Sequence, residues 1–549
     1  MWMGTAAVAA VWLLGAPFAM ADTLYVPGDY PTIQKAVDAA LDGDQVVVAP
    51  GAYYEKINLL GKAITVRSSD GPEVTTIDNQ GAGTVVKCVS GEGPETVLDG
   101  FTITGGSGTF NGGGMENYAS APTVANCIFT GNSAERGGGM CNTYASPTVI
   151  DCAFLDNAAD DGGGLCNYYS CYPTVIGCTF EGNDAVYRGG GLNASHDCVV
   201  TLVDCTFLDN SALECGGGIY SLDSDPVLSD CLFELNAAAT TAELGGGGGI
   251  AAELGDPELH GCVFLANTTP AWGGAFKFEN SAPAMVDCAF LGNDANKGGA
   301  LSYSYAAPVM VNCLFVGNTA TSWAAAISSH RSAPSILNCT IAANAAPDTG
   351  GLRIKQDPVE GATVVANCVL WANEDDTGDD QHAQLSLLWA DPELVNVDYS
   401  CVQGWADLVE GEGNIAVDPQ FVGPNEGDYR LSDASPCIDA ANNLALPDEI
   451  ELDLDGNPRL VDNPNVVDTG VMQFGDPGVV DMGAYEWQFP TCFGDLNQDG
   501  MVDVVDLLIL LATWGECPDP GHCFGDLDGS GEVDVIDLLL LLAVWGPCA

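Results

Sequence analysis

The stretch Cys127-Ile-Phe129-Thr-Gly-Asn132 is the first of ten copies of one short pattern, Cys-x-Φ-x-x-Asn, in which Φ is apolar and usually Phe. Consecutive copies begin 25, 26, 27, 26, 31, 26, 25, 26 and 29 residues apart. Such a period is typical of a repeat architecture in which each unit stacks on the next. The ten copies begin at Cys127, Cys152, Cys178, Cys205, Cys231, Cys262, Cys288, Cys313, Cys339 and Cys368.

Two kinds of corner frame the pattern. Cys and Φ are two residues apart, so on a strand both point to the same side, which we take to be the inside. The residue before each Cys tolerates the left-handed conformation, because it is Asn, Asp or Gly in all ten copies, and this predicts a one-residue corner. After the repeat's Asn, a small-residue loop leads to a run of glycines such as Gly112 to Gly114, and an apolar residue then opens another strand.

The repeat predicts three short strands and three turns, with parallel pairing between successive coils. We therefore expect an all-β fold, a right-handed parallel β-helix of about a dozen rungs, followed by a small α-helical C-terminal module. The predicted boundaries are a signal peptide at 1–21, an N-terminal cap and first rungs at 22–99, β-helix repeats at 100–375, a terminal β-helix segment at 376–487 and the C-terminal module at 492–549.

The N-terminal segment reads as a cap for the first exposed sheet edges. Ile33, Ala36, Val37 and Ala40 have helical spacing, and 46–48 reads as a short buried strand. With Tyr53-Tyr54-Glu55 and Ile64-Thr-Val-Arg67, this stretch resembles the entry cap of pectate-lyase-like right-handed β-helix proteins. The glycine runs combined with Phe-x-x-Asn resemble the polymorphic membrane protein repeats of bacterial surface adhesins, although residues 324–326, three alanines, replace one glycine run.

The charge of the chain limits its partners. It holds 75 Asp and Glu against 14 Lys and Arg, for a formal net charge of -61. Such a charge repels nucleic acid and anionic membranes and disfavours acidic polysaccharides. We expect neutral, cationic or calcium-bridged partners and no nucleic acid.

The first 21 residues are apolar and end with Ala19-Met20-Ala21, the small-x-small pattern of a secretory cleavage site. An uncleaved anchor is the alternative, because no Lys or Arg precedes the apolar run. The later apolar runs at 507–511 and 538–542 are far shorter than the ~20 residues that span a bilayer. We therefore expect a secreted, extracellular or surface-associated protein with no transmembrane segment after signal cleavage.

The 22 cysteines allow two interpretations. An exported chain with many cysteines suggests disulfides. The ten repeat cysteines, however, each lie one period apart, as a column of small buried side chains would. The sequence favours stacked thiols over a ladder of disulfides.

The C-terminal module is a tandem duplication. Residues 492–517 and 523–548 each begin Cys-Phe-Gly-Asp-Leu and continue into an apolar helix. Oxygen-bearing residues recur at positions 1, 3, 5, 7, 9 and 12 of each loop, which is the spacing that wraps ligands around one Ca²⁺. The predicted ligands of two calcium ions are Asp495, Asn497, Asp499, Met501, Asp503 and Asp506 in the first loop, and Asp526, Asp528, Ser530, Glu532, Asp534 and Asp537 in the second, with Met501 and Glu532 contributing backbone carbonyls.

The duplicated loop and helix resemble the type I dockerin, which implies a cohesin-like or other surface-anchoring partner. Positions 10 and 11, which are polar in many dockerins, are Val504-Val505 and Val535-Ile536, so the partner stays open. Each copy begins and ends with a cysteine, and small exported modules gain stability from such cross-links. We predict disulfides that join Cys492 to Cys517 and Cys523 to Cys548.

Aromatic residues recur shortly after the glycine runs. Stacked along the coil they predict a stripe for sugar rings, with coverage of the core edge as the alternative. The candidate carbohydrate-binding residues are Tyr118, Tyr144, Tyr168, Tyr169 and Tyr303.

The sequence carries weaker signals for catalysis than for calcium binding. A lyase needs a base beside a cation, and the sequence favours isolated solvated charges for its six candidates: Arg136, Arg188, Lys277, Lys297, Arg353 and Lys355. Asp160-Asp161 is the one notable carboxylate pair, and no Ser-His-Asp grouping stands out among the five histidines. No catalytic residue is assigned.

Taken together, these patterns favour an extracellular, noncatalytic β-helix protein that binds glycan or acts as a surface adhesin and is attached through a calcium-dependent dockerin-like tail. The alternative is a polysaccharide lyase or glycoside hydrolase with the same tail, since parallel β-helices host both. A purely structural surface protein is the third possibility.

Overall fold

The computed structural model describes residues 21–108, 110–242, 245–356, 361–406, 409, 411–463, 466–473, 475–488, 494–497, 501–516, 525, 527 and 532–547. These residues form an all-β parallel solenoid of about 13 turns with a few short helices. The chain divides into two compact units, residues 1–186 with 190–201 and residues 187–189 with 202–549. The predicted signal peptide lies outside the described residues except for its last position.

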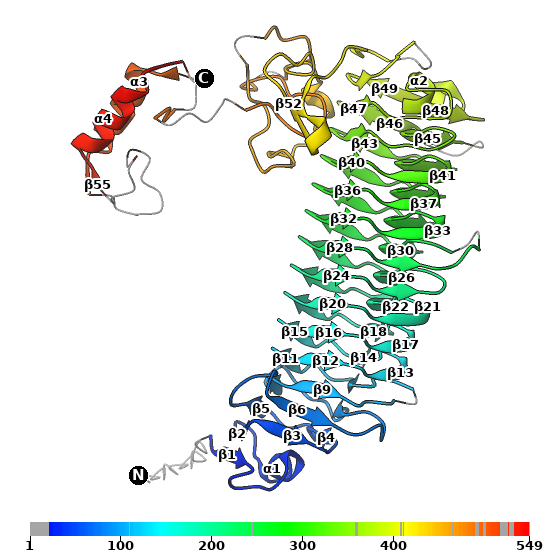
Figure 1. Cartoon of the computed structure of the whole chain (residues 1–549), viewed down its shortest axis with the longest axis vertical. Helices are drawn as coiled ribbons and strands as arrows, with labels where there is room; N and C mark the ends of the chain where they lie inside the picture. The colour runs from blue at the N-terminus through cyan, green and yellow to red at the C-terminus, as the bar shows by residue number, and fades with distance from the viewer. Residues whose placement is uncertain are drawn as a thin grey trace, which may run out of the picture. The chain divides into compact units, whose positions relative to one another are not determined.

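In the first unit, parallel strands stack turn upon turn in four sheets (Figure 1). Sheet A has the order β1 (Thr23–Val26), β2 (Gln45–Val48), β5 (Thr65–Ser68), β8 (Val97–Asp99), β11 (Thr123–Ala125), β15 (Thr148–Ile150) and β19 (Thr174–Ile176). Sheet B has β3 (Gly51–Tyr53), β6 (Thr75–Asp78), β9 (Thr102–Thr104), β12 (Ile128–Thr130), β16 (Ala153–Leu155) and β20 (Thr179–Glu181). Sheet C has β4 (Ile57–Asn58), β7 (Val86–Cys88), β10 (Met115–Tyr118), β14 (Met140–Thr143), β18 (Leu165–Tyr168) and β22 (Leu192–Cys198). Sheet D has β13 (Ser133–Arg136) and β17 (Ala158–Asp161).

The second unit repeats this arrangement, and β21 (Asp184–Arg188) and β23 (Thr201–Val203) each contain residues of both units. Its sheet A has β27 (Val227–Ser229), β31 (Glu258–His260), β35 (Ala284–Val286), β39 (Val309–Val311), β43 (Ser335–Leu337), β46 (Thr363–Ala366) and β49 (Val395–Asp398). Sheet B has β24 (Thr206–Leu208), β28 (Leu232–Glu234), β32 (Val263–Leu265), β36 (Ala289–Leu291), β40 (Leu314–Val316), β44 (Thr340–Ala342), β47 (Val369–Trp371) and β50 (Cys401–Val402). Sheet C has β26 (Ile219–Ser224), β30 (Ile250–Glu253), β34 (Phe276–Glu279), β38 (Leu301–Ser304), β42 (Ile327–His330), β45 (Leu352–Lys355) and β48 (Leu385–Leu388). Sheet D has β25 (Ser211–Ala212), β29 (Ala237–Ala238), β33 (Thr268–Trp272), β37 (Asp294–Lys297) and β41 (Thr319–Trp323).

Sheet D is the main departure from the predicted coil. The segment between the repeat's Asn and the glycines was expected to be a loop, and three strands were expected per turn. Instead this segment is extended and pairs with its neighbours, as in the register of Asp294 with Thr319. Its small side chains fit an extended backbone, and the hydrogen bonds of a parallel ladder need no particular side chains.

The core consists of stacked columns, as the period predicted. The repeat phenylalanines stack face to face, for example Phe129 on Phe154 at 4.9 Å in the first unit and Phe290 on Phe315 at 4.7 Å in the second. The 18 described cysteines are buried thiols, which confirms the stacked-thiol interpretation for the repeat cysteines. The four cysteines of the predicted tail disulfides lie outside the described residues.

The repeat's asparagines form a buried hydrogen-bonded ladder. The Asn293 side chain donates to Phe264 O at 3.0 Å and to Asn318 Oδ1 at 2.9 Å. It also accepts from the Asn267 side chain at 3.0 Å. Since each buried amide is satisfied by the turns on either side, the ladder fixes the register of successive coils.

The corners lie where the sequence predicted them. All ten residues that precede a repeat cysteine have a positive φ, such as 53° at Asn312. The first residue of most glycine runs is also left-handed, with φ 68° at Gly273, and Ala324 adopts the same conformation at 58°. The second glycine is required for space, because a Cβ on Gly274 would lie 2.2 Å from Gly299 O.

The N-terminal cap and the terminal segment complete the solenoid. Helix α1 (Ile33–Ala39) buries Ile33, Ala36 and Val37, as the helical spacing predicted. Strands β48, β49 and β50 carry the coil beyond the predicted end of the repeats at residue 375. The remaining elements up to residue 488 are α2 (Gln381–Gln384), η1 (Pro392–Leu394), β51 (Phe421–Gly423), η2 (Pro424–Glu426), β52 (Asp428–Leu431) and η3 (Asn443–Ala445).

The C-terminal module contains two similar halves. Helices α3 (Val504–Ala512) and α4 (Val535–Ala543) each begin with an Asp capping box. Two antiparallel pairs join the halves, with β53 (Met501–Val502) on β56 (Gly546–Pro547) and β54 (Gly515–Glu516) on β55 (Glu532–Val533). Among the described residues, no helix is both long and apolar enough to cross a membrane.

Candidate functional site

A groove of about 350 Å³ lies on the second unit, between the outer face of sheet C and the ends of the sheet D strands. Its lining combines aromatic rings with positive charges. The lining residues are Trp272, Lys297, Ser302, Tyr303, Trp323, Ser328, His330, Arg353, Lys355 and Leu388.

The floor of the groove follows from strand alternation in sheet C. Phe276 and Phe278 of β34 are buried in the core, so Lys277 between them points outward. The parallel register then places one outward residue above the next, in the order Lys277, Ser302, Ser328, Arg353 and Ser386. The Lys277 side chain is 4% exposed and lies 3.8 Å from Glu253.

The wall of the groove comes from the last residues of the sheet D strands. The ammonium of Lys297 lies 4.6 Å from the Trp272 ring centre and 4.4 Å from the Trp323 ring centre. The guanidinium of Arg353, which belongs to the floor, lies 4.9 Å from the Trp323 ring centre. Two indole rings and two cations therefore alternate along the groove, each cation attracted to a ring face.

Of the lining cations Lys297, Arg353 and Lys355, Arg353 is the most buried. Burial lowers its pKa, while the nearby Asp348 carboxylate, whose Oδ2 lies 3.3 Å from Arg353 Nε, opposes that shift. Its side chain is 10% exposed. An arginine in this setting stays charged and presents its planar donors to an anion that enters the groove.

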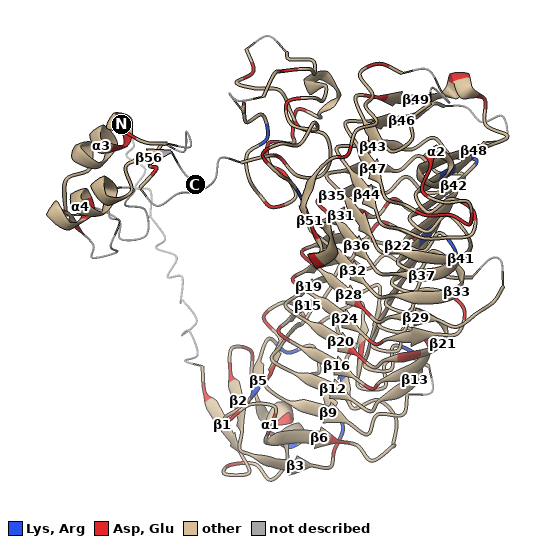
Figure 2. Ribbon diagram, turned by 45° about the horizontal axis from the view of Figure 1, so that its top comes forward, with Lys and Arg blue, Asp and Glu red and all other residues tan. Residues whose placement is uncertain are grey.

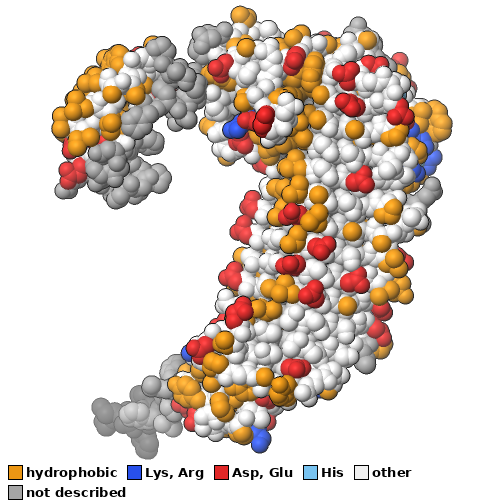
Figure 3. Space-filling view, viewed as in Figure 1, with side chains coloured by type: hydrophobic (Ala, Val, Ile, Leu, Met, Phe, Trp, Pro, Cys, Tyr) orange, Lys and Arg blue, Asp and Glu red, His pale blue; other side chains and the backbone are white. Residues whose placement is uncertain are grey.

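The groove concentrates positive charge on an acidic chain. It is lined by three of the 14 Lys and Arg, with Lys277 on its floor. Blue segments appear beside β41, β42 and β48 in Figure 2, and Figure 3 shows blue side chains gathered at the upper right edge. An anion that other surfaces repel is attracted here.

The interpretation of these lysines and arginines as isolated solvated charges is therefore wrong, because each of the six contacts an aromatic ring or a carboxylate. Lys297, Arg353 and Lys355 line one groove because the parallel register aligns positions that are one period apart, and Lys277 lies in the same outward column of sheet C as Arg353. The other two each cover a tyrosine: Arg136 lies 4.1 Å from the Tyr168 ring and Arg188 5.1 Å from the Tyr220 ring.

The aromatic row predicted from the sequence is present in the first unit. Tyr118, Tyr144 and Tyr169 are exposed, with ring centres 6.2 and 5.5 Å apart along the row, and Tyr168 lies 4.1 Å from Tyr169. Tyr303, in the second unit, is only 2% exposed and stacks on Phe278, so its ring face is closed to a sugar. Sugar binding by the exposed row stays a prediction.

Sequence reasoning missed Trp272 and Trp323 as partners of the cations. A signal for the wall was present, since Trp272, Lys297 and Trp323 each precede the first residue of a glycine run or its alanine replacement. This signal was overlooked because a loop was expected at that position, and side chains on a loop have no fixed alignment between coils.

Two places can hold a cation. Asp439, Asp462 and Asp468 bring carboxylate oxygens within 4.8 Å of one another. Burial, together with Asp462 and Asp468, raises the pKa of Asp439 to about 7. The predicted calcium loops are only partly described: Asp499, Asp526, Asp528 and Ser530 lie outside the described residues, and Asp495, Asn497, Met501, Asp503, Asp506, Glu532, Asp534 and Asp537 lie within them.

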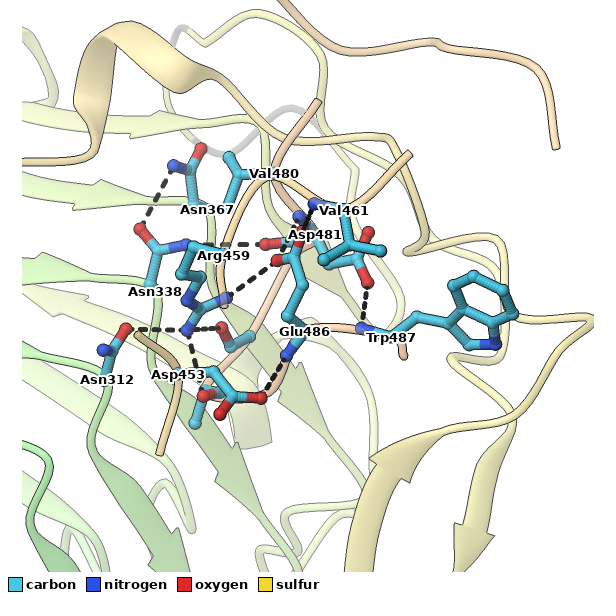
Figure 4. A network of polar contacts seen from close by, with 12 residues as sticks. Asn312, Asn338, Asn367, Asp453, Arg459, Val461, Val480, Asp481, Glu486 and Trp487 are labelled. Atoms are coloured by element: carbon cyan, nitrogen blue, oxygen red, sulfur yellow. Dashed lines mark hydrogen bonds and ion pairs between the residues drawn. The ribbon is translucent and has the colours of Figure 1, made fainter. Parts of the chain in front are cut away.

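A buried polar network, drawn in Figure 4, anchors the terminal segment. Arg459 Nη1 lies 3.3 Å from Glu486, and both side chains are almost fully buried. Arg459 also donates to Asn312 Oδ1 at 2.6 Å, across 147 residues of sequence. The nearby Asp453 accepts three backbone N–H groups, including that of Glu486, so the Asp-rich turn at 453–459 is held by its own hydrogen bonds. This network is closed to solvent and its role is structural.

The solenoid geometry agrees with comparison against known families. Residues 62–262 and 188–341 match the family described as "Right handed beta helix region", and together they cover more than half of the 549 residues. The chain belongs to this right-handed β-helix family. No curated protein sequence matched this β-helix protein.

Solved structures similar to the β-helix protein include a mutant of the PL6 family alginate lyase AlyGC, with a TM-score of 0.41 and 13% identity over 86% of this chain and 60% of that one. A GH87 alpha-1,3-glucanase catalytic unit from Streptomyces thermodiastaticus has a TM-score of 0.27 and 13% identity over 74% and 71% of the two chains. The carrot pectin methylesterase has a TM-score of 0.21 and 12% identity over 57% and 81%. The β-helix protein spans 60% of the length of AlyGC, and no chemistry is assigned to it from these neighbours.

Proposed function

We propose that this β-helix protein binds an anionic polysaccharide in the groove of the second unit and cleaves it by β-elimination. The observation that carries the proposal is the alternation of Trp272, Lys297, Trp323 and Arg353 along one groove of a chain that is otherwise strongly acidic. Indole faces suit the apolar faces of sugar rings, and the cations suit their carboxylates.

β-Elimination needs a cation and a base, and the groove contains candidates for both. A cation next to a uronate carboxylate stabilises the negative charge that develops when the C5 proton is removed. Lys297 and Arg353 are placed for this role. A base then takes the proton, the C4–C5 double bond forms, and the glycosidic oxygen at C4 leaves and takes up a proton from water. His330 and Lys355, whose strands pair in register at these residues, are the candidates for the base.

The test is a panel of anionic and neutral polysaccharides incubated with the full chain, with ultraviolet absorbance of unsaturated uronate as the readout. We expect absorbance to rise with a uronate polymer and the rise to be lost in Lys297→Gln. Lys56→Gln, which removes an exposed lysine outside the groove, is the matched control. Binding of an anionic polymer without product would refute the lyase and support the noncatalytic glycan binder. No binding of any anionic polymer would refute both.

A second proposal concerns the C-terminal module, which we infer is a calcium-dependent docking module. Its helices expose an unusual amount of apolar surface in two equivalent sets, seen as orange side chains at the upper left of Figure 3. The exposed residues are Val504, Val505, Leu508, Leu511 and Trp514 in the first half and Val535, Ile536, Leu539, Leu542 and Trp545 in the second. Apolar faces of this kind mark protein interaction sites.

The described calcium-loop residues fit such an ion. They supply oxygen donors, and the position-12 carboxylates, Asp506 and Asp537, are fully buried. Asp506 accepts from the N–H groups of Leu496 and Asp503, so the first loop already closes around it. A bound Ca²⁺ would neutralise these carboxylates and hold the loop and helix together.

Calcium titration of the full chain tests the module. Amide exchange in residues 501–516 and 532–547 should slow when Ca²⁺ is added, and Asp506→Asn should abolish the effect in the first half. Unchanged exchange in both halves would refute the calcium site. We further propose that the protein acts outside the cell, held by a cohesin-like or other anchoring partner at the apolar face.

A further inference from the structure

Next to Arg353 of the groove, Asp375, His382 and Ser386 form a hydrogen-bonded chain. Asp375 Oδ2 lies 2.8 Å from His382 Nδ1, and His382 Nε2 lies 3.2 Å from Ser386 Oγ. We propose that these residues are a serine nucleophile, its base and the group that orients the base, and that they hydrolyse carboxylic esters. No motif in the sequence indicates the grouping, because Asp375 comes from the turn before α2 and Ser386 from the strand after it.

Asp375 is held as a fixed carboxylate. Its side chain is 1% exposed, and its Oδ1 accepts from the N–H and hydroxyl of Thr377 and from the N–H of Gly378. Burial raises its pKa, but the hydrogen bonds from Thr377 and His382 outweigh burial and the pKa is lowered. An ionised Asp375 accepts a hydrogen bond from Nδ1–H of His382, which leaves the Nε2 lone pair directed at Ser386.

The elements that carry the base and nucleophile are themselves fixed. Asp380 caps α2 and accepts from the N–H of His382. Gln384, which is fully buried, accepts from the Asn373 side chain at 2.6 Å and so joins α2 to the end of the asparagine ladder. A base held on such a support keeps its direction without help from a bound substrate.

The surroundings supply positive charge beside the nucleophile. Ser386 is the register partner of Arg353 on the neighbouring strand. Asp348 lies 3.6 Å from His382 Nε2, but it also pairs with Arg353, which offsets its charge. The guanidinium is thus placed to stabilise an oxyanion that forms on a carbonyl attacked by Ser386.

The proposed reaction is acyl transfer to water. His382 takes the Ser386 hydroxyl proton as Oγ bonds to the ester carbonyl carbon. The carbon–oxygen bond to the alcohol then breaks, and His382 gives that proton to the departing alcohol. Water attacks the acyl-serine with His382 again as base, the acid is released and Ser386 regains its proton. Water is the only co-reactant.

The expected substrate is an O-acylated sugar in the groove, and this substrate class rests on the proposed function. The nucleophile itself does not, so its test uses p-nitrophenyl acetate and a fluorophosphonate probe with the full chain. We expect hydrolysis and covalent labelling at Ser386, both lost in Ser386→Ala, with hydrolysis falling about 100-fold or more. Ser304→Ala, on the strand three turns earlier in sheet C, should leave both unchanged.

Asp375→Asn separates an orienting role from a purely structural one. It should lower hydrolysis and change its pH profile, since the amide favours the other tautomer of His382, while circular dichroism stays unchanged. Absence of labelling at Ser386, or hydrolysis equal in wild type and Ser386→Ala, would overturn the triad. Hydrolysis of the small ester without acetate release from acetylated polysaccharides would overturn the substrate class. Neither result depends on whether uronate polymers are cleaved.

Discussion

Lys297 Nζ lies 4.4 Å from the centre of the Trp323 ring, and the two residues come from neighbouring strands of sheet D. Because Trp272 covers the same ammonium at 4.6 Å, Lys297 is held between two rings and cannot turn away from the groove. Binding an anion costs less side-chain entropy when the lysine is already fixed than when it is mobile. This arrangement therefore favours a role for Lys297 in binding an anion.

The first prediction concerns this lysine. Lys297→Gln should weaken binding of an anionic oligosaccharide about tenfold or more, since a hydrogen bond to a charged group contributes roughly 1.5–3 kcal/mol. Calorimetric titration at two ionic strengths measures it. The difference from wild type should shrink at high salt, because screening weakens the wild-type contact that the variant lacks. Equal affinities for wild type and variant would remove Lys297 from the site.

The second prediction concerns the buried pair of the terminal segment. Arg459→Met leaves Glu486 buried without its cation and should destabilise this segment by roughly 3–5 kcal/mol. Amide exchange of residues 437–442 and 478–488 reports it. Arg430→Met is the matched control: its side chain is 59% exposed and pairs with Asp428, so its cost should stay below about 1 kcal/mol.

The third prediction is the pH dependence of that defect. Burial raises the pKa of Glu486 to about 7, even though Arg459 lowers it, and loss of Arg459 would raise it further. A carboxyl whose folded pKa exceeds its unfolded value stabilises the fold at low pH, and this contribution is lost as pH rises through the folded pKa. The defect of Arg459→Met should therefore be smaller at pH 5 than at pH 8. A defect of the same size at both pH values would show that Glu486 does not titrate in this range.

The fourth prediction concerns the asparagine ladder. Asn293→Ala removes two donated bonds and leaves the Asn267 side chain and N–H without their acceptor, so we expect a loss of about 3 kcal/mol or more. Chemical denaturation followed by amide exchange in β32, β36 and β40 measures it. Asn296→Ala, whose bonds to Thr321 and Ser322 lie near the surface, should cost less than about 1 kcal/mol. Similar costs for the two would contradict a special role for the ladder.

The repeat itself could be predicted because its causes are local. An Asn, Asp or Gly before each cysteine allows a left-handed corner whatever the rest of the chain does, and Asn312 shows this with φ 53°. The same holds for the inward Cys and Phe and for the helical spacing in α1. Sheet D was missed because its pairing uses backbone groups, which leave little trace in side-chain pattern.

The candidate sites depend on which residues the strand register brings together. The coil, its corners and its buried thiol column can be predicted from the chain alone, since each follows from residues within one period. The folded structure was needed to show that Lys297 and Arg353 share a groove, that Arg459 reaches Asn312 and that His382 lies between Asp375 and Ser386. Those contacts depend on parallel pairing between coils and on the path of the chain at their ends, and neither is encoded in the spacing of any single motif.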